Sequence, residues 1–331
     1  MKTMKARRVA LATVVVATTA SLRPPGTATF AFVSNELSHD VSVVDLNKRT
    51  VVATIPVAGR PRGIHVSPDD RFVYVTTSDE QPNVEGAADA IAMIDVATRK
   101  VVKTFHIGTD PEQFAITPDG SMIVASNEDG GTATAIDVRS GKYVATFVTG
   151  IEPEGVAVSP DGRTAVVTSE TSNSVSVIDL VRRKVIDNVL VDLRPRSAAF
   201  SPDGKRLYVS AEIGGTISVI DVATRAVLTT VAADRSEGKP VTVVVSPDGK
   251  YVYTACGRTG RLSIIDARTN AFVASIPVGD RPWGVDLSPD GRYAYTANGR
   301  SNDIAIVDLA TRAVIARVPV GKLTWGVAIM H

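Results

Sequence analysis

The chain has 331 residues, of which 44% are hydrophobic and 5% aromatic, and its formal net charge is +1. This apolar content is ample for a folded core built mainly from Val, Ile, Ala and Leu. A charge so close to zero gives no overall electrostatic signature for binding nucleic acid or anionic lipid. The single cysteine, Cys256, excludes an intramolecular disulfide, so the fold must rely on its core.

Residues 1–20 have the composition of a secretory signal peptide. The basic head consists of Lys2, Lys5, Arg7 and Arg8. An apolar run of 12 residues then ends in small residues, and it is too short to span a bilayer. We expect cleavage near Ala20, a short linker at 21–28, and a periplasmic or secreted protein with no membrane segment. An uncleaved anchor is the alternative. Removing the four cations lowers the net charge from +1 to −3.

From residue 29 onward the chain repeats a unit of about forty residues. A Ser/Thr-Pro-Asp turn motif begins at Ser67, Thr117, Ser159, Ser201, Ser246 and Ser288. The aspartate of an Ile-Asp or Val-Asp pair recurs at Asp45, Asp95, Asp137, Asp179, Asp221, Asp266 and Asp308, at intervals of 42 to 50 residues. A period in the low forties with about four short strands per unit is typical of a β-propeller, and seven aspartates predict seven blades.

The seventh repeat gives the expected order of elements within a blade. Pro289 and Gly291 favour a tight turn, and alternating patterns at 292–296, 304–308 and 313–318 predict three strands. The first repeat lacks the turn motif, and the chain finishes with one further strand at 325–330. We therefore predict an all-β fold, a single seven-bladed propeller over 29–331 with four antiparallel strands per blade. The C-terminal strand should join the first blade and close the ring.

Strand direction sorts the loops onto two faces. The Ser-Pro-Asp-Gly turns lie on a repetitive face, and the aspartate of each Ile-Asp pair should accept bonds from backbone donors of the turn after it. The loops before each innermost strand and after each second strand lie on the other, irregular face, where we expect function. Two insertions, at 78–89 and 234–240, also fall on the irregular face.

The loop before each innermost strand carries a proline, or Thr324 in the last loop. The residue after it should belong to a ring around the mouth of the central channel, which we call the first ring. In chain order these residues are Arg62, Glu112, Glu154, Arg196, Val241, Trp283 and Trp325. Closure of the ring would place Trp325 beside Arg62. The two indoles could then stack on a planar or anionic group, with Arg62 or Arg281 pairing with it. The alternative is that the indoles plug the channel and the charges form solvated salt bridges.

A second ring is expected one residue after each second strand. Its carboxylates are Glu36, Glu128, Glu170 and Glu212. Together with Glu112 and Glu154, they could hold a hard cation through oxygen ligands. Solvated loop carboxylates are the simpler alternative.

Other chemistry has little support in the sequence. His65 lies in an innermost strand, and a hydrogen-bonded core histidine is a simpler interpretation than a metal or haem ligand. The sequence contains no Cys-x-x-Cys-His, no Gly-x-Ser-x-Gly and no phosphate loop. Covalent haem, nucleophilic hydrolysis and nucleotide binding are therefore not expected.

The repeats resemble the YVTN family of β-propellers, which Ser288–Gly321 follows nearly throughout. The irregular positions are more similar to the propellers associated with PQQ-dependent catabolism. These positions are Phe32–Glu36, Asp110–Ala115, Ile151–Gly155, Thr168–Thr171, Asn188–Asp192, Arg194–Arg196 and Glu212–Gly215. The shorter loop at 233–240 and the longer insert at 78–89 depart from that pattern.

This resemblance implies an exported, non-catalytic accessory of quinoprotein alcohol oxidation. As a monomer, it would bind PQQ or another small planar or anionic ligand, or contact a quinoprotein dehydrogenase or a cytochrome, at the irregular face. The alternative is a metal-dependent, lactonase-like hydrolase that uses the channel carboxylates. The family also resembles the haem-d1 propeller of nitrite reductase, but without an axial histidine we do not expect haem. The mature charge disfavours binding of single-stranded nucleic acid.

Overall fold

The computed structural model describes residues 29–80 and 86–330, which form seven four-stranded antiparallel sheets. The predicted signal peptide and linker lie outside these residues. None of the described residues lies in a helix, so this part of the chain has no helix that could cross a membrane. The strands are β1 (Phe30–Asn35), β2 (Asp40–Asp45), β3 (Thr50–Pro56), β4 (Arg60–Val66), β5 (Phe72–Ser78), β6 (Ala90–Asp95), β7 (Lys100–His106), β8 (Pro111–Ile116), β9 (Met122–Asn127), β10 (Thr132–Asp137), β11 (Tyr143–Val148), β12 (Pro153–Val158), β13 (Thr164–Ser169), β14 (Ser174–Asp179), β15 (Lys184–Leu190), β16 (Pro195–Phe200), β17 (Arg206–Ala211), β18 (Thr216–Asp221), β19 (Val227–Ala232), β20 (Pro240–Val245), β21 (Tyr251–Cys256), β22 (Arg261–Asp266), β23 (Ala271–Pro277), β24 (Pro282–Leu287), β25 (Tyr293–Asn298), β26 (Asp303–Asp308), β27 (Ala313–Pro319) and β28 (Thr324–Ile329).

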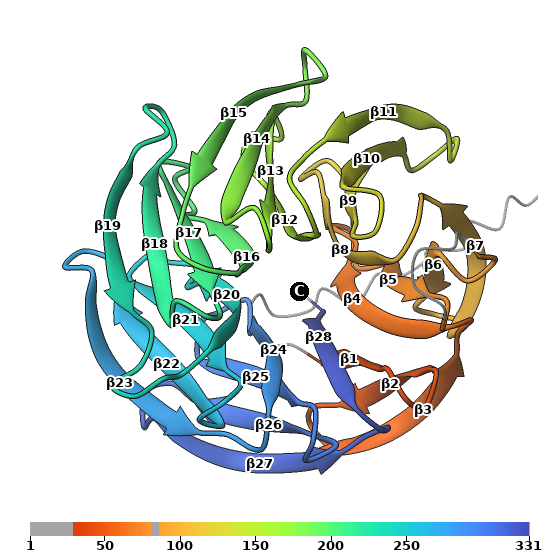
Figure 1. Cartoon of the computed structure of the whole chain (residues 1–331). Coiled ribbons are helices and arrows are strands. Elements are labelled where there is room, and N and C mark those ends of the chain that lie inside the picture. Colours follow the sequence, from red (N-terminus) through yellow and green to blue (C-terminus); the bar gives the residue numbers. More distant parts are fainter. Residues whose placement is uncertain (1–28, 81–85, 331) are drawn as a thin grey trace, which may run out of the picture.

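The seven sheets are arranged as blades around a central axis (Figure 1). Six blades contain four consecutive strands, whereas the first has the order β28-β1-β2-β3. In Figure 1 the blue β28 lies beside the red-orange β1, and Ala31 pairs with Ile329 across this junction. The predicted fold, with seven blades and a ring closed by the C-terminal strand, is therefore confirmed.

The hydrophobic core is divided into seven clusters, one at each junction between neighbouring blades. At the junction of the first two blades, for example, Phe32 and Val43 pack with Ile64, Val75 and Ile94. Small β-branched side chains dominate these clusters because two pleated sheets must interdigitate face to face. The blades are thus joined by packing, while the strands within each blade are joined by hydrogen bonds.

Two hydrogen-bonded turns shape the repetitive face. In the last turn motif, Ser288 Oγ donates to Asp290 Oδ1 at 2.6 Å and accepts from the backbone N–H of Tyr293 at 2.9 Å. Each of the seven Ile-Asp or Val-Asp aspartates accepts a backbone N–H from the turn that follows, as Asp308 does from Thr311 at 2.8 Å. These hydrogen bonds hold the aspartate pKa values below their usual range. The predicted structural role of this aspartate is confirmed.

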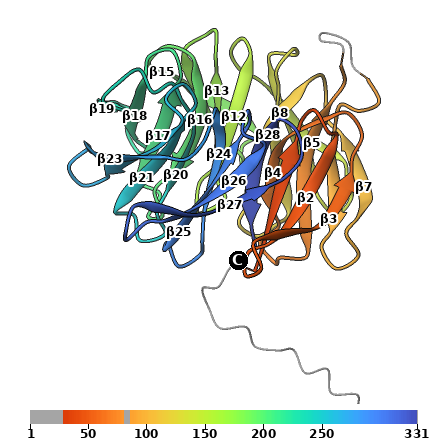
Figure 2. The same cartoon turned by 90° about the horizontal axis from the view of Figure 1, so that it is seen from below.

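The two faces are seen edge-on in Figure 2. The end of β28 lies at the lower rim, on the face that carries the Ser-Pro-Asp turns, because every innermost strand runs toward that face. The loops between blades lie at the upper rim. The candidate site is built from those upper loops.

Candidate functional site at the channel mouth

Backbone hydrogen bonds tie the two predicted rings of the mouth together. In six blades the residue directly before the innermost strand has a positive φ, as Asp110 (φ 44°) and Arg194 (φ 60°) do. Its carbonyl accepts the backbone N–H of the second-ring residue in the same blade. Glu128 donates to Asp110 at 3.1 Å, and Glu212 donates to Arg194 at 2.8 Å. The left-handed residue therefore fixes the distance between the rings.

Hydroxyl groups from the preceding blade fix the first ring. Ser or Thr side chains on second strands donate to the carbonyl oxygens of first-ring residues in the next blade. The bonds run from Ser34 to Arg62, from Thr76 to Glu112 and from Ser126 to Glu154, at 2.6, 2.9 and 2.6 Å. With the backbone held in this way, the side chains of the first ring project from rigid strands.

Arg62 joins carboxylates from two blades. Its guanidinium contacts Glu112, which is completely buried, and lies 3.3 Å from Glu36 Oε1. Arg60 pairs with the same Glu36 oxygen at 3.2 Å and with Asp110 Oδ1 at 3.3 Å. The result is a buried ionic cluster that spans the first three blades.

A second cluster is centred on Arg196. Its guanidinium lies 2.8 Å from Glu154 Oε1 and contacts Glu170, and both carboxylates are buried. Arg194 pairs with Glu170 at 2.7 Å and reaches Glu212 at 3.6 Å. The predicted alternative of solvated salt bridges does not describe these pairs, because their carboxylates are withdrawn from water.

Glu128 lies between the two clusters and has no ion-pair partner among the described residues. The sequence explains this difference from the other second-ring glutamates. Glu36 and Glu170 meet Arg-Pro-Arg at the entrance of the next blade, whereas the next entrance after Glu128 is Glu152-Pro153-Glu154. Burial, with the nearby charge of Asp110, raises the pKa of Glu128 to about 7.

Glu154 also resists ionisation, although it is paired with Arg196. Burial raises the pKa of Glu154 to about 8. Arg196 lowers this pKa, but the same guanidinium must also neutralise Glu170 and Glu212. One cation shared by three carboxylates cannot offset the desolvation of all of them.

The aromatic arc lies on the other side of the mouth. The Trp283 indole covers Gly299, where an added Cβ would lie 2.4 Å from the ring. Gly299 occupies the second-ring position that carries glutamate in four other blades, so here an indole takes the place of a carboxylate. The Arg281 guanidinium lies 5.8 Å from the centre of the Trp283 ring and 3.9 Å from Glu212.

Trp325 is buried, with 5% of its surface exposed. Its neighbour Gly326 packs against the carbonyl of Arg62, so the ring closes with these residues side by side, as predicted. The Arg62 guanidinium, however, is bound to Glu36 and Glu112. Arg281 and Trp283 are therefore the more accessible pair for a planar or anionic group.

Three residues of these clusters were not among the predicted site residues: Arg60, Asp110 and Arg194. Each lies immediately before the proline of a loop whose next residue was predicted. The sequence contains a signal for these residues, because Arg-Pro-Arg and Asp-Pro-Glu carry charge on both sides of the proline. Asp110 and Arg194 adopt a left-handed conformation, which joins their carbonyls to the second ring, whereas at Arg60 the preceding Gly59 adopts it.

His65 is exposed on the innermost strand β4, and it is not the buried core residue that we expected. Its ring packs edge-on against Phe114, with 4.8 Å between ring centres. Asp286, at the same register in another blade, accepts the backbone N–H of Ile329 at 2.9 Å and so secures the closing strand.

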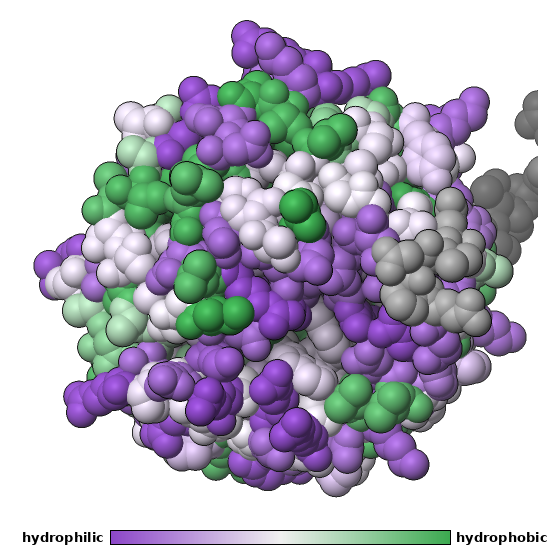
Figure 3. All heavy atoms as spheres, in the orientation of Figure 1, coloured by the Kyte–Doolittle hydropathy of each residue, from purple (hydrophilic) through white to green (hydrophobic). Residues whose placement is uncertain are grey.

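Two sizeable cavities lie between blades on the repetitive face. One of about 670 Å³ is lined by turn residues that include Pro202, Tyr208 and Pro247, and another of about 540 Å³ includes Pro68, Tyr74 and Asp119. They recur because the turns recur, so they belong to the scaffold. The mouth itself is a hydrophilic hollow, with apolar groups gathered toward the rim (Figure 3).

Comparison with known proteins shows where this architecture occurs. The family model described as "Lactonase, 7-bladed beta-propeller" matches residues 22–146 and 191–314. Antigen Lp49 of Leptospira interrogans is 28% identical over 102 residues, which cover 29% of this chain and 22% of that protein. The chain thus spans about a fifth of the length of this curated relative.

Two solved structures illustrate the similarity of fold. Hydrazine synthase of Kuenenia stuttgartiensis superposes with a TM-score of 0.77 at 25% identity, covering 85% of this chain and 93% of that one. A putative 6-phosphogluconolactonase of Bacteroides fragilis gives a TM-score of 0.76 at 20% identity, covering 93% of this chain and 100% of the other.

Proposed function

Because the chain belongs to the seven-bladed β-propeller lactonase family, we propose that it is a ligand-binding propeller that takes a small polar molecule at the channel mouth. We place it outside the cytoplasm, as an accessory of quinoprotein alcohol oxidation. The observation that carries the proposal is the array of buried carboxylates and partly buried arginines around the channel axis.

The propeller fold does not require these charges. The sixth blade has Val241 and Gly257 at the two ring positions, and it packs like the others. Burying ion pairs costs desolvation energy and often contributes no net stability. These charges cost desolvation energy and are confined to one arc of the mouth. Recognition of a polar ligand explains them better, because it needs fixed donors and acceptors.

The Arg281 and Trp283 pair suits a planar anion such as PQQ. The Arg281 side chain is 33% exposed, and its nearest carboxylate among the described residues is 3.9 Å away. Because this ion pair is weak, the guanidinium can pair with a ligand. The partly exposed indole beside it offers a flat stacking surface. The association with a quinoprotein dehydrogenase or a cytochrome rests on the YVTN-type resemblance, and export rests on the signal-peptide composition.

Titration of PQQ against tryptophan fluorescence tests this proposal, because both tryptophans of the chain lie at the mouth. We expect saturable quenching that Trp283→Phe abolishes and that the buried-site variant Trp325→Phe retains. Arg281→Ala should weaken binding at least tenfold, whereas Arg292→Ala, on the repetitive face, should not change it. Unaltered fluorescence at high micromolar PQQ would remove this ligand.

Hydrolysis of a lactone is the second candidate function, which the family and the carboxylates of the mouth favour. A carboxylate held near a guanidinium could activate water while the cation stabilises the oxyanion. Proton release from glucono-δ-lactone, with and without added Ca²⁺, tests it. We expect a rate above the spontaneous one that is lost in Glu128→Gln. A rate equal to that in buffer alone would exclude hydrolysis of this lactone.

A further inference from the structure

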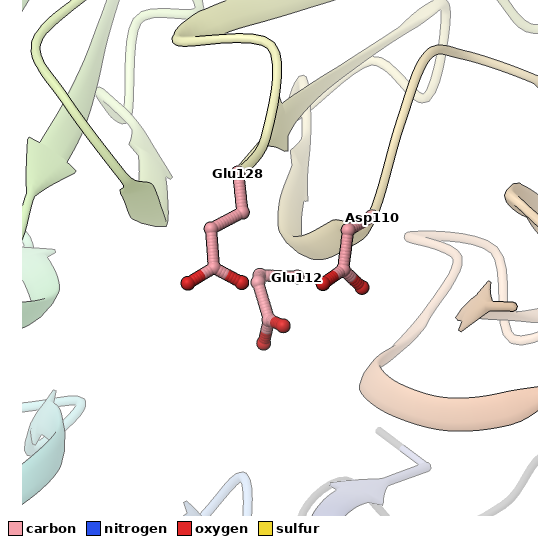
Figure 4. Close-up of side chains that lie close together, drawn as sticks. All are labelled: Asp110, Glu112 and Glu128. Atoms are coloured by element: carbon pink, nitrogen blue, oxygen red, sulfur yellow. The ribbon is translucent and has the colours of Figure 1, made fainter. Parts of the chain in front are cut away.

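We propose that Asp110, Glu112 and Glu128 form a binding site for a divalent cation, with Ca²⁺ as the best match (Figure 4). The site lies on the acidic side of the channel mouth. It does not depend on the ligand or reaction proposed above.

The geometry suits one ion. One carboxylate oxygen from each of the three residues lies within 4.8 Å of the other two. Oxygen ligands of Ca²⁺ lie about 2.3–2.6 Å from the ion, so two oxygens of one shell are separated by at most about 5 Å. Figure 4 shows the three side chains converging from the loop before β8, from β8 itself and from the loop after β9.

The backbone holds these residues before any ion arrives. All three belong to the third blade, and the Glu128 N–H donates to the Asp110 carbonyl at 3.1 Å. Thr76 of the preceding blade donates to the Glu112 carbonyl at 2.9 Å. A site built on strand ends and fixed from two sides loses little conformational entropy when it binds.

Glu112 supplies an independent observation that points to a cation. Its side chain is completely buried, and Oε2 has no hydrogen-bond partner among the described residues. Arg62 contacts the other oxygen, Oε1. A buried carboxylate oxygen without a donor is costly, and a bound cation would provide the missing interaction.

The neighbouring arginines orient the carboxylates without using all their oxygens. Arg60 forms a salt bridge with Oδ1 of Asp110, and Arg62 forms one with Oε1 of Glu112. One oxygen of each carboxylate therefore remains for an ion. With Glu36 included, four carboxylates face two guanidiniums. This group carries a formal charge of −2, which one divalent cation balances.

The donor set indicates the type of cation. The three ligands are all carboxylates, which suit hard cations, whereas Zn²⁺ and Cu²⁺ sites usually contain nitrogen or sulfur ligands. Mg²⁺ requires near-octahedral geometry at shorter distances and retains several waters, so it should bind more weakly in a dense cluster of side chains.

Calorimetric titration of CaCl₂ into the protein, after treatment with a chelating resin, tests the proposal. We expect one site with a Kd of about 10⁻⁵–10⁻³ M, and a Ca²⁺-dependent rise in melting temperature that EDTA reverses. MgCl₂ should give at least tenfold weaker binding. The absence of both binding heat and a shift in melting temperature at 10 mM CaCl₂ would overturn the site.

Two variants locate the ion. Glu128→Gln should weaken binding at least tenfold, and Asp110→Asn should do the same. The matched control is Glu170→Gln, at the equivalent position of the next blade, where Arg194 and Arg196 already pair with the carboxylate. Unchanged affinity in Glu128→Gln, or an equal loss in Glu170→Gln, would place the ion elsewhere and reject the proposal.

Discussion

Glu154 illustrates how a buried carboxylate responds to neighbours that are also charged. Its partner Arg196 lies 2.8 Å away, and a single pair of this kind would normally favour the ionised carboxylate. Here Arg196 also contacts Glu170 and lies 4.0 Å from Glu212. Desolvation therefore prevails, and the pKa of Glu154 is raised to about 8.

We predict that stability falls as pH rises because of Glu154. Its folded pKa of about 8 is above the ordinary value of 4.5, so the folded protein binds this proton more tightly than the unfolded chain. The contribution is complete below about pH 4.5 and is lost as pH rises through 8. Urea denaturation should give a lower free energy of unfolding at pH 9 than at pH 6.

Glu154→Gln should reduce this pH dependence, because an amide does not titrate. Glu237→Gln is a suitable control, because that side chain is 79% exposed and is therefore not desolvated by folding. An equally steep pH dependence in Glu154→Gln would show that other groups cause it.

Several residue roles could be predicted from the sequence, and the reason is repetition. An aspartate present in all seven repeats must serve each blade, and Asp308 does so through Thr311. The direction in which one long side chain points is not repeated from blade to blade, so it could not be predicted in this way. Arg62 lies beside Trp325 as predicted, but its guanidinium is bound to Glu112, because that buried carboxylate offers a stronger interaction than an indole face.

At the scale of the element, the loop before each innermost strand is the least predictable part of the blade. Asp110, Glu152, Arg194, Lys239, Arg281 and Leu323 all adopt a left-handed conformation there. Apart from aspartate, which visits it occasionally, these residue types do not favour it, and glycine is the usual choice. The conformation persists because each carbonyl accepts a bond from the second ring, which is a tertiary interaction invisible in the local sequence.

The turn motif shows the opposite behaviour, since its glycine is required locally. Gly291 has a φ of +67°, and an added Cβ would lie 3.3 Å from Cδ of Pro247 in the preceding turn. The same arrangement joins Gly249 to Pro202 at 3.6 Å. The turns of successive blades therefore pack glycine on proline around the repetitive face.

We predict that Gly291→Ala lowers the free energy of unfolding by about 1–2 kcal/mol, because a left-handed conformation costs an L-residue roughly that amount. Gly215→Ala is the matched control, since Gly215 has a φ of +71° and no atom within 4 Å of an added Cβ. Gly291→Ala should be the more destabilising of the two in urea denaturation. Equal losses would mean that the contact with Pro247 contributes nothing.

At the scale of the whole molecule, ring closure could be predicted from what the first repeat lacks. That repeat has no Ser-Pro-Asp motif, so its innermost strand had to come from the chain end, and β28 supplies it. The position of the site on the ring was predictable to the same extent. The raised pKa of Glu128 was not, because it depends on how deeply the folded loops bury that carboxylate.

Circular permutation can measure how much the shared blade contributes to closure. The backbone N–H of Met330 donates to the Phe30 carbonyl at 3.1 Å, so a short linker can join residue 330 to residue 29. Opening the joined chain at 321–323 makes every blade continuous. Opening it between Arg300 and Ser301 instead divides the seventh blade between the two new ends, as the natural chain divides the first.

We predict that the permutant opened at 321–323 unfolds at least tenfold faster than the one opened between Arg300 and Ser301. In the first, the ring can open by parting two packed blade faces. In the second, opening must also break the pairing of β25 with β26, which runs from Tyr293 opposite Asp308 to Asn298 opposite Asp303. Tenfold corresponds to about 1.4 kcal/mol of activation free energy, a modest share of six paired positions. Unfolding rates in urea, followed by tryptophan fluorescence, check this, and equal rates would mean that blade packing alone holds the ring closed.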